Sequence, residues 1–154
     1  MDGYAFEAQM TRVVTIGLVP EGLRLDADYA GTITEGPLSG AAIEGVDHFL
    51  VRPDGVGVID ARQVFSSEDG RTVASAVRGY VTPPAGMPTL EEVADPAFVW
   101  PDVDLPMHGA VDLRTAAPDL QALNATVFGF TGTLNVARGE LRVRAQSLAP
   151  VPVG

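Results

Sequence analysis

Residues 46–82 consist of short apolar runs, each of which ends in a tight turn sequence. Pro53-Asp54-Gly55 and Glu68-Asp69-Gly70 place glycine where a turn requires a positive φ, and Pro83-Pro84 closes the segment. Parallel strands need a crossover of about a dozen residues, whereas these runs follow one another directly. The segment is therefore predicted to be an antiparallel meander with strands over residues 47–52, 56–66 and 72–81.

The flanking segments continue this pattern. Further strands are predicted over residues 4–14, 23–33, 126–136 and 140–148. In the last of them, Leu141 and Val143 alternate with Arg142 and Arg144, which is typical of a sheet with one face in water. Residues 56–66 differ because both faces carry apolar side chains. One face is predicted to line a barrel interior, and the other to be covered by a flap or a partner subunit.

A long proline-rich stretch, residues 83–106, separates the two strand-rich parts. It carries six of the twelve prolines, and it also contains the only tryptophan, Trp100. Thr89 and Glu92 have the spacing of a capping box, which predicts one short helix over residues 89–94. A connection of this length inside a compact domain is usually functional. We interpret it as a flap over the end of the barrel; the alternative is a crossover that plugs the core.

These patterns predict an all-β protein: a single antiparallel β-barrel domain over residues 1–154, with one short helix in the flap. The composition excludes several kinds of catalytic and metal site, because all ten basic residues are arginine and the chain has no cysteine. Schiff-base lysines, thiolate nucleophiles and cysteine–zinc sites are therefore excluded. With only His48 and His108, a three-histidine metal site is excluded as well, and we expect neither metal nor cofactor.

The net charge of −10 opposes binding to nucleic acids and to anionic membranes, so neither is expected as a partner. No apolar run approaches the roughly 20 residues of a membrane span. The N-terminal residues lack the basic start and apolar core of a signal peptide. A cytoplasmic location is therefore expected.

Five short motifs follow one another in order: Glu35-Gly36-Pro37-Leu38-Ser39-Gly40, Gly45-Val46-Asp47-His48, Leu50-Val51-Arg52-Pro53-Asp54-Gly55, Ile59-Asp60-Ala61-Arg62 and Glu68-Asp69-Gly70. Two more, Leu113-Arg114-Thr115 and Leu120-Gln121-Ala122-Leu123-Asn124, follow at matching spacing. Together they resemble the domain-of-unknown-function family 3237, a group of small β-barrel proteins, over residues 23–145. The resemblance implies a closed or nearly closed antiparallel barrel that pairs into a homodimer, and it implies no established reaction.

The chain departs from the family pattern at several positions. His48 replaces a frequent tryptophan, Arg114 a glutamate and His108 an arginine, while Leu120 and Ala122 replace two aromatic residues. If these positions line a pocket, its shape and charge differ from those of the relatives that the chain resembles.

Two groups of residues are predicted to be catalytic. Asp60 and Arg62 share one strand face with apolar neighbours, so they are a candidate general base and oxyanion clamp, or an internal salt bridge. His108 and Arg114 share a face if their strand is unbroken, with Asp112 between them to orient the histidine. The alternative for this second group is a solvated polar face.

Four further residues are predicted to contact the ligand: Asp47, Trp100, Asn124 and Phe128. The function that follows is a cofactor-independent isomerase, cyclase or lyase acting on a small apolar carbonyl compound inside the barrel. The alternative is a non-catalytic barrel that binds a small molecule or serves as a dimeric accessory subunit.

Overall fold

The computed structural model describes residues 1–83, 85 and 88–148. The strands are β1 (Gly3–Val19), β2 (Gly22–Glu35), β3 (Ala42–Val51), β4 (Gly57–Ser66), β5 (Thr72–Val81), β6 (Leu105–Thr115), β7 (Val127–Asn135) and β8 (Glu140–Ser147). Two short helical segments interrupt this order, α1 (Leu90–Ala94) and the 3-10 segment η1 (Pro118–Ala125).

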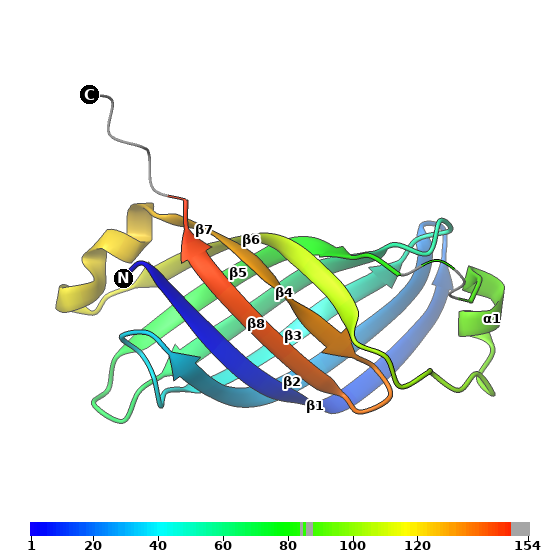
Figure 1. Cartoon of the computed structure of the whole chain (residues 1–154), viewed down its shortest axis with the longest axis horizontal. Coiled ribbons are helices and arrows are strands. Elements are labelled where there is room, and N and C mark those ends of the chain that lie inside the picture. Colours follow the sequence, from blue (N-terminus) through cyan, green and yellow to red (C-terminus); the bar gives the residue numbers. More distant parts are fainter. Residues whose placement is uncertain (84, 86–87, 149–154) are drawn as a thin grey trace.

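Every strand pairs antiparallel with the next one along the chain, and β8 pairs with β1, so the sheet closes into a barrel. The predicted all-β barrel is thereby confirmed. Figure 1 shows α1 at one end of the barrel and η1 at the other, together with the N-terminus. The two ends are named below the α1 end and the η1 end.

Side chains fill the barrel at the η1 end. The fully buried large residues there are Ile33, Ile43, Phe65, Val73, Leu113 and Phe128. Leu38 from the β2–β3 loop and Leu120 and Leu123 from η1 join the same cluster and close this end. An eight-stranded barrel is just wide enough to be filled by side chains in this way.

The predicted helix is confirmed within one residue. Thr89 caps α1 through its side chain, which accepts from the Glu92 backbone N–H, while the Glu92 side chain accepts from the Thr89 N–H. The described part of the 83–106 segment lies at the α1 end, where the flap was expected. Pro84, Gly86 and Met87 of that segment fall outside the described residues.

The flap does not cover the outer face of β4, so of the two covers expected there only the partner subunit stays a prediction. Val64 on that face is 43% exposed, and α1 sits at the barrel end rather than along the wall. In the described part of the chain, no helix is long and apolar enough to cross a membrane.

Candidate functional site

The barrel is hollow toward the α1 end. A cavity of about 730 Å³ lies there, with residues from all eight strands in its wall. The wall is mainly apolar, with side chains such as Phe6, Leu25, Phe49, Met107 and Phe130. Its polar groups are few, which is the usual make-up of a small-molecule site.

Two glycines explain why this half of the barrel is not filled. A Cβ on Gly45 would lie 2.6 Å from Cζ of Tyr29, and one on Gly57 would lie 2.3 Å from Cζ of Phe49. The two aromatic rings therefore lie against the wall, over strand positions that carry no side chain. Rings held against the wall leave the lumen open.

Tyr29 and Gln63 line the inner end of the cavity, which is called its floor below, and their polar groups are joined by hydrogen bonds. The Tyr29 hydroxyl donates to Oε1 of Gln63 (2.7 Å), and Nε2 of Gln63 donates to Oγ of Ser75 (3.1 Å). This series of hydrogen bonds connects β2, β4 and β5. It passes over Gly45 of β3, which pairs with both Tyr29 and Gln63. These bonds hold Tyr29 and Gln63 in fixed orientations at the floor of the cavity.

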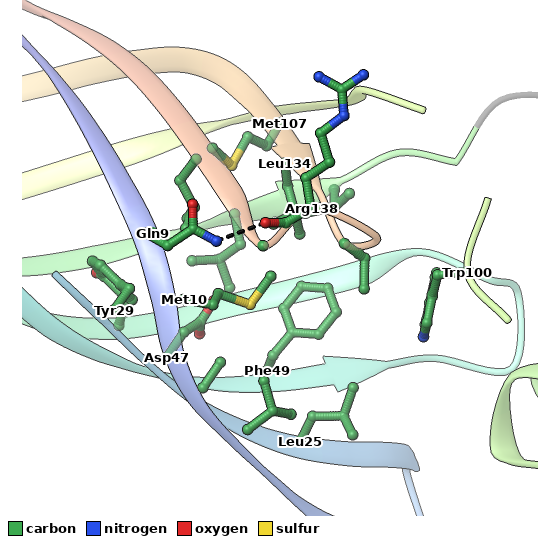
Figure 2. Close-up of a pocket in the computed structure, with 18 of the residues that line it drawn as sticks. Gln9, Met10, Leu25, Tyr29, Asp47, Phe49, Trp100, Met107, Leu134 and Arg138 are labelled. Atoms are coloured by element: carbon green, nitrogen blue, oxygen red, sulfur yellow. Dashed lines mark hydrogen bonds between the residues drawn. The ribbon is translucent and has the colours of Figure 1, made fainter. Parts of the chain in front are cut away.

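Asp47 is the acidic group of this floor. Backbone pairing of β3 with β4 extends to Asp47↔Ala61 and resumes at Leu50↔Val58. Within that gap, the Asp60 N–H donates to Oδ1 of Asp47 (2.9 Å). The carboxyl group thus takes a backbone donor from the sheet, and it also lines the cavity between Tyr29 and Phe49 (Figure 2).

Burial raises the pKa of the Asp47 carboxyl to about 6, although the Asp60 N–H opposes the shift. The negative charge of Asp60 adds to the increase, and that of Asp26 adds less. A carboxyl group that titrates near neutral pH can both accept and return a proton under physiological conditions.

Tyr4 supplies the second unusual group. Its ring packs edge-on against Phe65 (5.3 Å between centroids) and tilted against Phe128 (5.8 Å). Among the described residues, its hydroxyl oxygen is the one buried side-chain polar atom without a hydrogen-bond partner. Burial raises the pKa of this phenol, so it stays protonated and available as a donor. Tyr4 also lines the cavity.

The α1 end of the cavity is formed by the flap and the β7–β8 turn. Phe98 and Trp100 line it, with their rings edge-to-face at 5.2 Å. Across from them, Nε2 of Gln9 donates to the backbone oxygen of Arg138 (2.6 Å) and ties β1 to the turn (Figure 2).

Two of the predicted ligand contacts, Asp47 and Trp100, lie in the wall of this cavity. The other two do not. Asn124 caps the end of β6, accepting from the Thr115 N–H and donating to the Thr115 backbone oxygen. Phe128 has no exposed surface and belongs to the packed core at the η1 end.

Asp60 and Arg62 do not form the expected pair in apolar surroundings. Both point away from the lumen, where Asp60 lies 3.8 Å from Arg62 and 3.6 Å from Arg78, and the Arg62 side chain is 60% exposed. Side chains alternate between the two faces of β4, and those that point into the barrel are Ile59, Ala61 and Gln63.

His108 and Arg114 also lie on the outer face of the barrel. His108 is exposed, with its ring 6.1 Å from that of Tyr80, and the exposed Arg114 donates to the backbone oxygen of Leu113. The alternative of a solvated polar face describes them correctly. None of the four predicted catalytic side chains lines the cavity.

The sequence interpretation missed Tyr4, Tyr29 and Gln63. For Gln63 a signal existed, because a polar residue stood among Ile59, Ala61 and Phe65 on one strand face. The two tyrosines carried no such signal, since tyrosine is common in ordinary strands. No cluster of three or more potential metal-ligating side chains occurs within residues 1–83, 85 and 88–148.

Gly45→Ala is expected to push Tyr29 into the lumen and to break its hydrogen bond to Gln63, because the new Cβ occupies the place of the ring. We expect a loss of about 1–2 kcal/mol in unfolding free energy, measured in urea. Gly129→Ala is the matched control, since its Cβ would only touch the Leu148 side chain at 3.4 Å. Equal stability of the two variants would contradict this account of the hollow.

Comparison with known proteins gives the fold and the family. A protein of unknown function from Clostridium acetobutylicum ATCC 824 has a TM-score of 0.77 at 17% identity, covering 97% of this chain and 100% of that chain. A conserved protein of unknown function from Rhodopseudomonas palustris has a TM-score of 0.73 at 19% identity, covering 96% and 95%.

A β-barrel-like protein from Acinetobacter baumannii AYE has a TM-score of 0.71 at 23% identity, covering 94% of this chain and 91% of that chain. No curated protein matches the chain significantly. The three structures share the barrel, and the family profile extends beyond the segment in which the sequence motifs were found. Its match over residues 3–146 shows that the chain belongs to the family described as "Protein of unknown function (DUF3237)".

Proposed function

We propose that this protein binds one small, largely apolar molecule inside the barrel, with a polar atom of the ligand against the floor. The observation that carries the proposal is the apolar cavity of about 730 Å³, whose wall includes a few polar side chains, among them Asp47, Tyr4 and Tyr29. Its size falls within the range of about 300–1,000 Å³ that is typical of small-molecule sites. An eight-stranded barrel accommodates a single ligand of this kind.

A carbonyl compound suits this floor best. The Tyr4 hydroxyl is a buried donor without a partner among the described residues, and a small shift of its ring toward the cavity would let it donate to a ligand carbonyl oxygen. A carboxylate or phosphate ligand would instead meet the negative charge of Asp47 in a poorly hydrated space.

Fluorescence titration with the neutral dye 1-aminoanthracene tests the proposal, because Trp100 is the only tryptophan and lines the cavity. We expect saturable quenching of Trp100 emission. Ala61→Phe places a ring in the lumen and should weaken dye binding at least tenfold, whereas Ala74→Phe on the outer face of β5 should change it less than twofold. Absence of saturable binding, or equal affinity of the two variants, would contradict the proposal.

The cofactor-independent enzyme expected from the sequence requires reacting groups within this cavity. Asp60, Arg62, His108 and Arg114 are outside it, so a catalytic role would fall to Asp47 and Tyr4. The homodimer and the cytoplasmic location stay predictions; sedimentation at two protein concentrations tests the first of them.

A further inference from the structure

One oxygen of the Asp47 carboxyl is held by the sheet, whereas the other is open to a bound molecule. Oδ1 accepts from the Asp60 N–H (2.9 Å), which fixes the orientation of the group. Oδ2 accepts no hydrogen bond from the described residues, and it is not among their fully buried atoms, so it retains accessible surface. Because Asp47 lines the cavity, a ligand inside the barrel can reach this oxygen.

The side chains next to this carboxyl are small. On the neighbouring strands, Asp47 pairs with Ala27 of β2 and with Ala61 of β4, and both alanines line the cavity. Directly paired residues of antiparallel strands point to the same face of the sheet. The two methyl groups therefore flank the carboxyl and leave room for a ligand group beside it.

No basic side chain of the described residues neutralises the Asp47 charge. None of their ion pairs involves it. Arg138 is the one basic side chain in the described cavity wall, but it is 57% exposed and pairs with Asp102 (2.9 Å). An ionised carboxyl in a mainly apolar cavity carries a desolvation cost, and a bound cation would offset that cost.

The cation that fits this cavity is an organic one. A metal ion needs several ligating groups, and the described parts of the chain hold no cluster of three or more such side chains. A neutral hydroxyl group would donate to Oδ2 but would leave the charge uncompensated. A protonated amine on an apolar body supplies both the charge and the donors, while the apolar wall contacts the rest of the molecule.

We infer that the ligand carries a protonated amine, which forms an ion pair with the Asp47 carboxylate inside the barrel. The inference rests on the proposed binding of an apolar carbonyl compound, and it adds a cationic group to that compound. The ammonium group donates to Oδ2, and Oδ1 keeps its bond from the Asp60 N–H.

The ion pair requires an ionised Asp47, so its strength should depend on pH. Burial raises the pKa of this carboxyl to about 6, and the charges of Asp60 and Asp26 add to the increase, whereas His48 lowers it. Tyr29, which shares the floor, stays neutral because burial raises its pKa. Between about pH 7.5 and about pH 5 the ionised fraction of Asp47 falls about tenfold, and the affinity for an amine should fall with it.

Displacement of 1-aminoanthracene by two bicyclic compounds of the same shape tests the inference. At about pH 7.5, 2-aminotetralin carries a protonated amine where 2-tetralol carries a hydroxyl group. Wild type should bind the amine at least tenfold more tightly than the alcohol, and Asp47→Asn should reduce this preference to less than twofold. Asp112→Asn, which changes an exposed carboxyl on the outer face of β6, is the control and should keep the preference within twofold of wild type. The dye affinity of each variant is measured first, so that displacement gives a dissociation constant.

The outcomes separate recognition of the amine from binding as such. If 2-aminotetralin binds no more tightly than 2-tetralol, or if Asp47→Asn keeps the preference, the inference is overturned and the binding function stands. A wild-type affinity for the amine that stays constant between about pH 7.5 and about pH 5 overturns it as well. If the dye itself does not bind, the proposed function fails. A fall of about tenfold that disappears in Asp47→Asn and persists in Asp112→Asn would assign the effect to this carboxyl rather than to the net charge of the protein.

Discussion

Asp47→Asn is expected to raise the unfolding free energy at about pH 7.5 by roughly 2–3 kcal/mol, which makes it a stabilising substitution. Burial raises the pKa of this carboxyl to about 6 in the folded barrel, against about 4 in the unfolded chain. At neutral pH the folded state therefore carries a charge that it accommodates poorly, and asparagine removes this cost. The asparagine oxygen still accepts from the Asp60 N–H.

The effect depends on pH with a definite sign. Between about pH 4 and pH 6, the folded protein binds more protons at Asp47 than the unfolded chain does, so wild-type stability falls as pH rises. The advantage of Asp47→Asn should therefore be near zero at about pH 4 and complete above about pH 6.5. Asp69, whose pKa is lowered to about 2 mainly by its hydrogen bond from Ser67, titrates below this window.

Urea unfolding of wild type, Asp47→Asn and the control Asp112→Asn at about pH 4.5 and pH 7.5 measures this difference. If Asp47→Asn is no more stable than wild type at the higher pH, the carboxyl is not held in the desolvated state described here.

Phe128→Ala is expected to lower the unfolding free energy by about 3–5 kcal/mol. The Phe128 side chain has no exposed surface, and its ring lies 5.8 Å from that of Tyr4 in the packed η1 end. The barrel wall around it is fixed by sheet pairing on both sides of β7, so the space left by the ring cannot collapse easily. Thermal unfolding should shift down by roughly 10 °C.

Val127→Ala is the matched control, because Val127 precedes Phe128 on the same strand but is 45% exposed on the outer face. It should cost less than about 1 kcal/mol. The dye affinity of folded Phe128→Ala, measured well below its unfolding temperature, should remain within about threefold of wild type. A near-neutral stability change, or a large selective loss of dye affinity, would restore Phe128 as a ligand contact.

The alternation of side chains along a strand explains why some residues of the site were predictable from the sequence and others were not. Strand residues alternate between two faces, so the sequence correctly grouped Asp60 with Arg62, and Ile59 with Ala61 and Gln63. It could not say which group faced the lumen, because β4 carries both apolar and polar residues on each face. The sequence analysis chose the charged face for the site, and the structure places that face on the outside of the barrel.

Asp47 and Trp100 lie in the cavity wall, and the sequence singled them out for different reasons. Asp47 belongs to a motif shared with the family, and Trp100 stands in an apolar flap that had to pack against something. Tyr4 could not have been found in this way. Its buried position depends on Phe65 and Phe128, which are distant in the chain and meet it only across the closed barrel.

The sequence by itself determined the local features: the turns at Gly55 and Gly70, the capped helix after Thr89 and the antiparallel order of the strands. These depend on residues within a few positions of one another, whose backbone preferences act in any context. Only the tertiary structure decided which face of each strand became the interior and which half of the barrel stayed hollow. Closure of β8 onto β1 sets the first, and the rings of Tyr29 and Phe49 lying over Gly45 and Gly57 set the second. Both depend on contacts between strands, and such contacts exist only once the sheet has closed.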